Sequence, residues 1–267
     1  MSTVKRKLPF VLAASDHGTM IVSRLDYHMV SKTSGFGVGF QILESGAFDS
    51  EEISLAVSVL DFRRRYFNDG VFAIDCGANI GVHSIEWAKH MTGWGSVLAI
   101  EPQERIYYAL AGNIVINNCF NAIALNAAVS DAQGVLKIPR LDYLVPTSFG
   151  SLELRPTSNP EYIGQAVDYD GSLATVQAIS IDSLNVSRID FIKIDVEGME
   201  MAVLAGAVEA VRQHRPVMLI ESLKTGAQTL KQWLEQREYA IFQAGINVLA
   251  IHKSDQTLSH FRQKGSA

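Results

Sequence analysis

The sequence predicts an α/β fold with a mostly parallel, Rossmann-like sheet that ends in an antiparallel hairpin. From Val71 onward, short apolar runs alternate with amphipathic segments, as in parallel strands joined by crossover helices. A glycine-containing turn follows the first of these runs, within residues 71–81. Near the C-terminus, two further runs flank Ala244-Gly245 and predict a β-hairpin. These observations indicate one nucleotide-binding type of sheet rather than several small domains.

Composition excludes several classes of protein. Hydrophobic residues make up 48% of the 267 residues and charged residues 19%, as expected for a globular protein with a large core. No apolar run approaches the roughly 18 residues that cross a bilayer, so we expect no membrane partner. A net charge of −5 disfavours a nucleic-acid partner.

Cysteine content and the N-terminus bear on the compartment. Two cysteines provide neither a disulfide framework nor a zinc cluster, which favours a reduced, cytoplasmic setting. The basic residues Lys5-Arg6-Lys7 precede an apolar run at 8–14, but Pro9 interrupts it. We therefore interpret this run as an N-terminal strand rather than a signal peptide.

The first predicted strand of the alternating region leads into a glycine loop. Val71–Ile74 is apolar enough for a buried strand, and a helix is predicted to start at Val82. Glycine permits left-handed turns and a close approach of the backbone to a ligand, and the amides at a helix start can face a polar group. The candidate ligand-binding residues of this loop are Asp75, Gly77, Ala78, Asn79 and Gly81.

The spacing of this loop separates two candidate cofactors. A dinucleotide fingerprint needs the pattern GxGxxG, which is absent here, and Asp75 would repel a pyrophosphate. An acid at this position suits a ligand with an amino group or a sulfonium. A second predicted strand, 95–100, ends on Glu101, where a carboxylate can accept hydrogen bonds from ribose hydroxyls. These features indicate S-adenosylmethionine, with NAD as the weaker alternative.

Residues 1–70 are predicted to form an extension of short strands and one helix. Runs at 10–13 and 20–24 flank Asp16-His17-Gly18 and predict a hairpin. The glycine-rich stretch 34–39 is interpreted as a turn or strand edge that no helix directly follows. We expect this extension to contribute to acceptor selection or to a homodimer, because it is small to bury itself alone.

A helix is predicted to begin after Asp49, a typical N-cap residue followed by acids. Arg63, Arg64 and Arg65 are interpreted as the solvated C-terminal end of this helix.

Residues 71–267 are predicted to form the cofactor-binding domain. Further strands are expected at 122–129, 135–138, 176–181, 189–194 and 217–220, and further helices at 103–117, 199–214 and 227–238. Residues 139–175 interrupt the alternation with four prolines and no sustained period. A stretch of this length inside a compact domain is usually functional, so we interpret it as a loop that covers the substrate.

Acidic residues stand at the ends of several predicted strands. They are Asp75, Glu101, Asp195 and Glu221. Ligands of open α/β sheets bind beyond the carboxyl ends of the strands, where these side chains are expected to meet.

Two motifs resemble a known family. The sequence DCGANIG with the following Glu101-Pro102, and the segment IKIDVEGMEMAVLAGA, are similar to the FkbM-type family of class I S-adenosylmethionine-dependent methyltransferases. The resemblance covers about residues 72–221, and the second motif is its more specific part. It implies a seven-stranded sheet whose last strand is antiparallel, in agreement with the predicted terminal hairpin.

The resemblance also implies roles for individual residues. The glycine loop would lie along the methionine part of the cofactor, Glu101-Pro102 beside the ribose, and Asp131 near the adenine. Asp195 and Glu197 match the family's DVEG, whose place is beside the methyl group. Members methylate hydroxyls of sugars, polyketides and other small metabolites, so O-methylation of a small molecule is the expected activity.

The proton acceptor and a metal ion are left open by the sequence. Asp195 is the first candidate for a base or a hydroxyl-orienting group, followed by Glu197 and Glu221, with His83 and His214 as alternatives. A divalent cation between Asp195 and Glu221 is possible. An NAD-dependent oxidoreductase and a non-catalytic cofactor-binding module are the alternative functions.

Overall fold

The computed structural model describes residues 6–31, 34–158 and 160–261. Lys5 of the basic N-terminal segment lies outside the described residues. The chain forms two compact units: unit 1 comprises Met1–Phe48 and Lys137–Thr175, and unit 2 comprises Asp49–Leu136 and Val176–Ala267. This division differs from a boundary at residue 70, because the helix that starts after Asp49 falls in unit 2 and the 139–175 loop falls in unit 1.

Unit 1 contains the predicted N-terminal hairpin. Strands β1 (Phe10–Ser15) and β2 (Gly18–Ser23) pair antiparallel around the turn at Asp16-His17, as predicted. Two short strands, β3 (His28–Met29) and β4 (Gly35–Phe36), also pair antiparallel. Unit 1 also contains the helix α1 (Val38–Ser45) and the 3-10 helix η1 (Phe149–Ser151).

Helix α1 corrects the prediction that no helix directly follows the glycine-rich stretch. Gly37 has φ 139°, and a Cβ built on it would lie 2.4 Å from the carbonyl oxygen of Asp26. The buried Asp26 carboxylate accepts hydrogen bonds from the amides of Gly39 (2.9 Å) and Phe149 (3.0 Å). The glycines therefore allow α1 to start against the Asp26 backbone, a tertiary contact that local sequence does not show.

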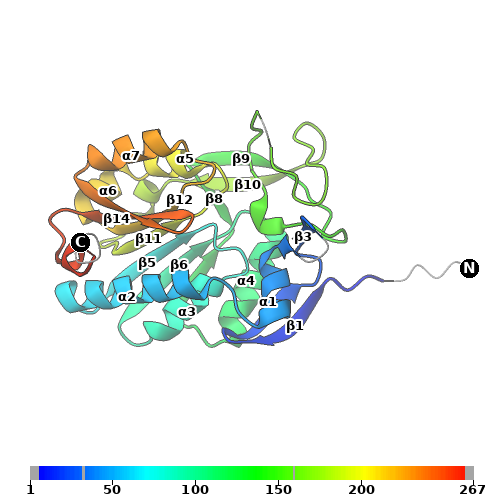
Figure 1. Ribbon diagram of the computed structural model, residues 1–267, viewed down its shortest axis with the longest axis horizontal. Coiled ribbons are helices and arrows are strands. Elements are labelled where there is room, and N and C mark those ends of the chain that lie inside the picture. Colours follow the sequence, from blue (N-terminus) through cyan, green and yellow to red (C-terminus); the bar gives the residue numbers. More distant parts are fainter. Residues whose placement is uncertain (1–5, 32–33, 159, 262–267) are drawn as a thin grey trace, which may run out of the picture. The chain divides into compact units, whose positions relative to one another are not determined.

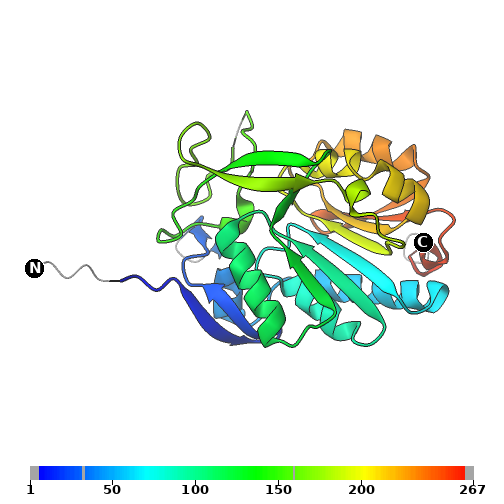
Figure 2. The same cartoon turned by 180° about the vertical axis from the view of Figure 1, so that it is seen from behind.

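Unit 2 is built on the predicted seven-stranded sheet (Figures 1 and 2). Its strands are β5 (Val71–Cys76), β6 (Gly95–Ile100), β7 (Ala122–Leu125), β11 (Phe191–Ile194), β12 (Val217–Glu221), β13 (Tyr239–Ala244) and β14 (Asn247–His252). The order is β13-β14-β12-β11-β5-β6-β7, and β14 runs antiparallel to both of its neighbours. The mostly parallel sheet and its terminal hairpin are confirmed.

Helices cover both faces of this sheet (Figure 1). Helices α2 (Ser50–Phe67) and α3 (Val82–His90) lie on one side, and α5 (Glu200–Ala205), α6 (Val208–His214) and α7 (Ala227–Glu235) lie on the other (Figure 1). Helix α4 (Glu104–Ile116) packs on the edge strand β7. The short helices η2 (Ile181–Leu184) and η3 (Gln256–His260) follow β10 and β14.

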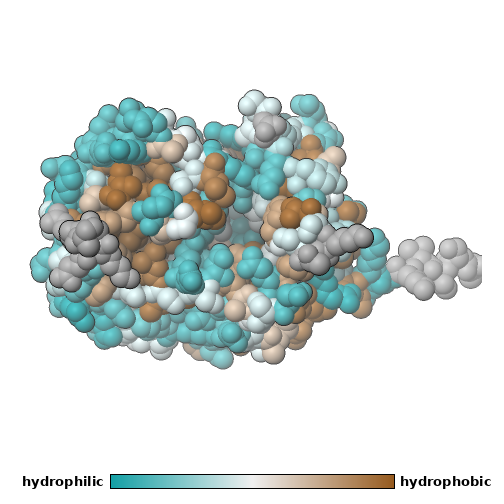
Figure 3. Space-filling model, viewed as in Figure 1, coloured by the Kyte–Doolittle hydropathy of each residue, from teal (hydrophilic) through white to brown (hydrophobic). Residues whose placement is uncertain are grey.

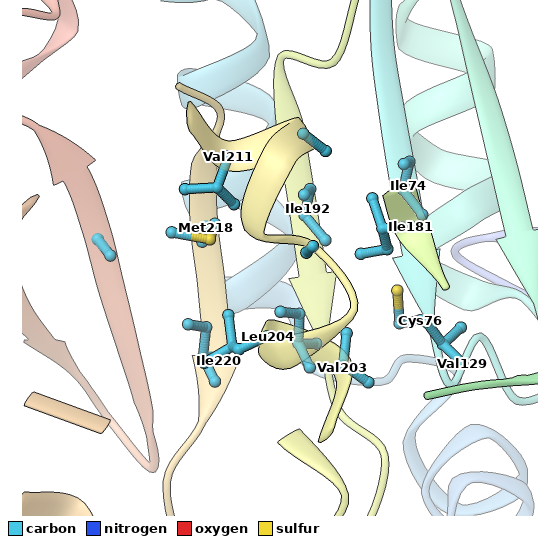
Figure 4. Close-up of a cluster of buried hydrophobic side chains, with 14 of the residues drawn as sticks. Ile74, Cys76, Val129, Ile181, Ile192, Val203, Leu204, Val211, Met218 and Ile220 are labelled. Carbon is cyan, nitrogen blue, oxygen red and sulfur yellow. The ribbon is translucent and has the colours of Figure 1, made fainter. Parts of the chain in front are cut away.

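The core of unit 2 lies between the sheet and helices α5 and α6 (Figure 4). Ile192 on β11 and Ile220 on β12 face Val203 and Leu204 of α5, all of them fully buried (Figure 4). Burying a side chain of this size stabilises the folded state by about 1.5–3 kcal/mol. This packing fixes the ends of β11 and β12, from which Asp195 and Glu221 project.

The strand predicted at 122–129 is two strands in two sheets. After β7, Asn126 donates side-chain hydrogen bonds to the carbonyls of Glu101 (2.8 Å) and Pro102 (3.1 Å). The chain then continues as β8 (Ala127–Val129), which pairs with β10 (Leu173–Ile179) in a sheet of order β8-β10-β9 that also contains β9 (Gly134–Pro139). Asn126 is the one polar residue within this apolar run, and it is the only sign of the break in the local sequence.

The helix predicted at 199–214 is also divided, into α5 and α6. Gly206 lies at the break, and a Cβ on it would be 2.1 Å from the carbonyl oxygen of Ser130. Because Gly206 has no side chain, its backbone can approach that of Ser130 this closely at the point where the helix is interrupted. The helical spacing itself was correct on both sides of the break.

Arg63 corrects the interpretation of a solvated arginine end on α2. Its side chain is buried and forms ion pairs with Asp190 (3.1 Å) and Asp255. Arg64 and Arg65 are exposed, in agreement with the prediction. Arg63 thus fastens α2 to the residue before β11 and to the residue before η3.

Apolar surface gathers around the hairpin. On the face drawn in Figure 3, hydrophobic residues cluster where Figure 1 places β14 and its surroundings. The outer strand β13 carries the half-buried Ile241 and Phe242, and Ile246 at the turn is exposed.

Across the part of the chain that the structure describes, no helix combines the length and apolar character that spanning a membrane requires.

Candidate active site

The carboxyl edge of the sheet in unit 2 brings the predicted acids together. Strands β12, β11, β5 and β6 are neighbours and run parallel, so their carboxyl ends form one continuous edge. Asp75 is the penultimate residue of β5, Glu101 follows β6, Asp195 follows β11, and Glu221 ends β12. The predicted clustering of these side chains at one edge is therefore confirmed.

The glycine loop lies directly against the loop after β11. Gly77 has φ 82°, and a Cβ on it would be 1.8 Å from the carbonyl oxygen of Asp195. The amides of Gly77 and Ala78 donate to the carbonyl of Ile100, at 3.0 and 2.9 Å. Gly81, with φ 91°, leads into α3. The loop predicted to bind the cofactor and the loop that carries Asp195 are thus in backbone contact.

Glu101 connects this loop to the end of β6. Its buried carboxylate accepts hydrogen bonds from the amides of Asn79 (3.0 Å) and Gln103 (2.8 Å). Burial raises the pKa of Glu101 to about 7, although the two amides act in the opposite direction. Each carboxylate oxygen has a second lone pair, so Glu101 can still accept hydrogen bonds from a ribose.

Asp75 has an oxygen whose partner is not supplied by the described residues. Its Oδ2 accepts a hydrogen bond from Ser84 (2.6 Å), whereas its Oδ1 is buried and receives none from the described part of the chain. Buried acceptors are nearly always satisfied. A ligand with a cationic or N–H donor group at this edge fits this arrangement, and the pyrophosphate of a dinucleotide does not.

Asp195 is held by a lysine from its own strand. The Nζ of Lys193 lies 2.7 Å from Oδ2 of Asp195. The Lys193 side chain is 6% exposed, and the Asp195 side chain is 37% exposed. One oxygen of the carboxylate is therefore paired inside the protein while part of the group remains accessible from the edge.

Glu197 and Glu200 shape the turn after Asp195. Glu197 adopts a left-handed φ of 53° and forms a short ion pair with Lys224. The buried Glu200 accepts hydrogen bonds from the amides of Val196 (3.2 Å) and Gly198 (3.0 Å) and from the hydroxyl of Thr225 (2.7 Å). These contacts tie the loop after β11 to the loop after β12. Burial, reinforced by the Asp195 charge, raises the pKa of Glu197 to about 8.

Glu221 is buried, and its carboxyl group has a raised pKa. Burial, followed by the charge of Asp195, raises its pKa to about 7. Its Oε2 receives no hydrogen bond from the described residues. A carboxylate with a pKa near the working pH is suited to accept a proton.

Behind these acids, Glu52 of α2 joins three other elements. Its carboxylate pairs with the Nε2 of His83 (3.1 Å), accepts a hydrogen bond from Asn247, and lies 3.9 Å from the Nζ of Lys193. Burial alone would raise the pKa of Glu52, but these partners lower it to about 2. Helix α2, helix α3, β11 and β14 therefore meet in one polar cluster.

This cluster bears on the metal prediction. Among the described residues, one group of three potential metal ligands lies within 4.8 Å, namely Asp49, Glu52 and His83; Asp195 and Glu221 belong to no such group. The charged Lys193 beside Glu52 already supplies positive charge there. A divalent cation between Asp195 and Glu221 stays a prediction.

Asp49 stands at the predicted N-cap, but its side chain makes no capping hydrogen bond with the described residues.

Two predicted residues are not placed at this edge. His214 ends α6, immediately before β12 begins, and therefore lies toward the amino end of that strand. Asp131 is exposed and follows β8, whose partner is β10 rather than a strand of the seven-stranded sheet. Its proposed position near the adenine stays a prediction.

Sequence reasoning missed Lys193, Glu52 and Glu200. Lys193 offered a usable signal, because a lysine within the apolar run FIKI must be paired if the strand is buried. Glu200 stands three residues after Glu197 at the start of a helix, where acids are common. Nothing in the local sequence links Glu52 to the site.

Raised carboxyl pKa values predict an unusual dependence of stability on pH. The folded state keeps the Glu101 proton up to pH about 7, whereas the unfolded state releases it near 4.5. The folded state therefore binds more protons between these values, and the free energy of unfolding falls as the pH rises through this window. For Glu101 the expected fall is on the order of 3 kcal/mol.

Urea denaturation of the ligand-free protein at pH 5, 6, 7 and 8 measures this fall. Glu101→Gln removes its part of the slope, and Glu104→Gln, an exposed neighbour on α4, is the matched control. Equal slopes in wild type and Glu101→Gln would contradict the assignment.

Comparison with known proteins agrees with the geometry. The seven-stranded sheet with its antiparallel β14 and its acidic glycine loop defines a Rossmann-like methyltransferase fold. The family model described as "Methyltransferase FkbM domain" matches residues 75–241, and the chain belongs to this family. The protein is therefore a methyltransferase, and S-adenosylmethionine is the methyl donor typical of its fold. This finding sets aside the dinucleotide oxidoreductase alternative.

The individual relatives have low sequence identity to this chain. Methyltransferase sdnD of Sordaria araneosa is 26% identical over 206 residues, which cover 70% of this chain and 74% of the relative. The crystal structure of methyltransferase FkbM from Methylobacillus flagellatus KT is similar at 19% identity and a TM-score of 0.49, covering 73% of this chain and 48% of that one. This chain thus spans about half the length of that crystallised protein. A precorrin-6y C5,15-methyltransferase from Geobacter metallireducens GS-15 is similar at 16% identity and a TM-score of 0.43, covering 78% and 89% of the two chains.

Proposed function

We propose that the protein transfers the methyl group of S-adenosylmethionine to a hydroxyl of a small acceptor such as a sugar or a polyketide. The observation that carries this proposal is the contact between the glycine loop and the loop of Asp195, with Glu221 at the end of the next strand. A cofactor cradle and two proton-handling carboxylates on one edge are what an O-methylation requires.

The residues that would hold the cofactor are those of the glycine loop together with Glu101-Pro102. The buried Oδ1 of Asp75, which receives no hydrogen bond from the described residues, suits a donor group of the cofactor, and Glu101 suits its ribose hydroxyls. When bound, the cofactor supplies a methyl group on an electron-poor sulfonium.

The chain's own task is to orient the acceptor and remove its proton. The accessible part of the Asp195 carboxylate accepts a hydrogen bond from the acceptor hydroxyl and orients its oxygen. Asp195 would take the O–H proton as the acceptor oxygen receives the methyl group and the methyl–sulfur bond breaks, and the ionised form of Glu221, whose pKa is about 7, would receive that proton next. Glu197 lies in the same loop and pairs with Lys224.

We expect Asp195→Asn to lower turnover by about 100-fold or more, since a positioned acid–base group contributes about 10²–10⁴-fold. The affinity for S-adenosylhomocysteine should stay within about threefold, because Asp195 touches the glycine loop through its backbone. The measurement is S-adenosylhomocysteine formation with a panel of sugar and polyketide alcohols. Glu235→Gln, at an exposed acid of α7, is the control. Unchanged turnover in Asp195→Asn would remove this assignment.

A further inference from the structure

Lys193 occupies a position that apolar residues normally fill. It lies in β11 between Ile192 and Ile194, and every residue of this strand is buried. An ammonium group in such a place is stabilised only if it is paired. The function described so far assigns it no role.

The geometry of β11 aims this ammonium at Asp195. Residues i and i+2 of an extended chain point to the same side, so both side chains leave the chain in one direction. The Nζ of Lys193 lies 2.7 Å from Oδ2 of Asp195. The lysine is enclosed, and the carboxylate that it holds reaches the accessible edge.

The ammonium group of Lys193 also lies near a second carboxylate, that of Glu52. Glu52 lies 3.9 Å from the Nζ of Lys193 and is held in turn by His83 and Asn247. Both Glu52 and Asn247 lie outside residues 75–241, the segment that matches the family. Helix α2 and strand β14 therefore support a residue of the family segment.

We propose that Lys193 is a positioning residue that keeps Asp195 ionised and in one orientation for methyl transfer. This inference rests on the proposed function, which gives Asp195 its place beside the acceptor.

Charges around Asp195 show why such a residue is needed. The negative charge of Asp195 lies among other carboxyl groups and contributes to the raised pKa of each of them: Asp49, Glu101, Glu197 and Glu221. Glu52, which is also a carboxylate, lies 3.9 Å from the Nζ of Lys193. Lys193 supplies a positive charge at direct contact distance from Asp195.

Lys193 also keeps its own charge. Burial by itself would lower the pKa of its ammonium, but Asp195, Glu52 and Asp75 raise it above the ordinary value. Lys193 is therefore protonated at neutral pH, and it acts through Asp195 rather than as a base.

The test follows the Asp195 carboxyl carbon by NMR in protein labelled with [γ-13C]aspartate, with the signal assigned by its loss in Asp195→Asn. In Lys193→Met, the midpoint of this signal's titration should move up by about 1–3 pH units, the usual effect of losing an adjacent opposite charge. Lys193→Arg should restore the wild-type midpoint. Lys231→Met, at an exposed ion pair on α7, should leave it unchanged.

Lys193→Gln, which removes the charge but keeps a hydrogen-bond donor, repeats the measurement if the methionine variant does not fold. An unchanged midpoint in a folded Lys193→Met or Lys193→Gln variant overturns the inference. Calorimetric titration with S-adenosylhomocysteine accompanies each variant, and affinity within about threefold of wild type is expected. Absence of binding to wild type overturns the proposed function instead, so the two failures are distinguishable.

Discussion

Replacing Gly77 with alanine is expected to weaken cofactor binding by about 100-fold and to destabilise unit 2 by about 3 kcal/mol or more. The new Cβ would lie 1.8 Å from the carbonyl oxygen of Asp195, and the residue would have to keep φ 82°. The left-handed backbone costs about 1–2 kcal/mol and the overlap about 1–3 kcal/mol more. If the loop moves to relieve this overlap and must return to its wild-type position to hold the ligand, the same cost weakens binding of S-adenosylhomocysteine by about 100-fold.

Two other glycines separate the causes. Gly93 has φ 84° with open space around its Cβ position, so Gly93→Ala should show the backbone cost alone. Gly134 has neither restriction, and Gly134→Ala should change the free energy of unfolding by less than about 0.5 kcal/mol. Urea denaturation and calorimetry measure both quantities. A Gly77→Ala variant no worse than Gly93→Ala would show that the contact with Asp195 is unimportant.

Replacing Arg63 with methionine is expected to cost about 3–5 kcal/mol of stability, because two buried carboxylates lose a partner. Asp190 and Asp255 are both buried, and Arg63 pairs with each. Asp190 also accepts a hydrogen bond from the amide of Phe72 (3.0 Å), so the loss extends to the start of β5. Arg188 still pairs with Asp190 at 2.7 Å, which keeps the cost at the level of one broken pair.

The next residue on α2 gives a matched control. Arg64 pairs with Asp69 at 2.7 Å, but both side chains are exposed. An exposed pair contributes about 0–1 kcal/mol, so Arg64→Met should change stability little. Urea denaturation of both variants measures the difference. Equal effects would contradict the view that Arg63 holds α2 in place.

The sequence was sufficient for the elements with a strong local pattern. The strand β5, the glycine loop and α3 follow from an apolar run, two glycines and a helical period, and the structure has them where they were predicted. The common edge of the four acids also follows from the sequence, because parallel neighbouring strands place their carboxyl ends together. These features depend on chain direction and short-range geometry.

The features that the sequence did not predict depend on contacts between residues that are distant along the chain. The break at Gly206 depends on the backbone of Ser130, and the burial of Arg63 depends on Asp190 and Asp255. No period or composition within one segment contains this information. The same reason hides Glu52, which reaches the site only because α2 packs beside α3.

The most direct test of the account is calorimetric titration of the protein with S-adenosylhomocysteine, on wild type and on Asp75→Ala. We expect micromolar binding to wild type and its loss in the variant, because the buried Asp75 carboxylate has an oxygen left for the ligand. Glu104→Ala, an exposed acid of α4, should bind as wild type does. No binding of S-adenosylhomocysteine to wild type would contradict the assignment of this edge as the methyl-donor site.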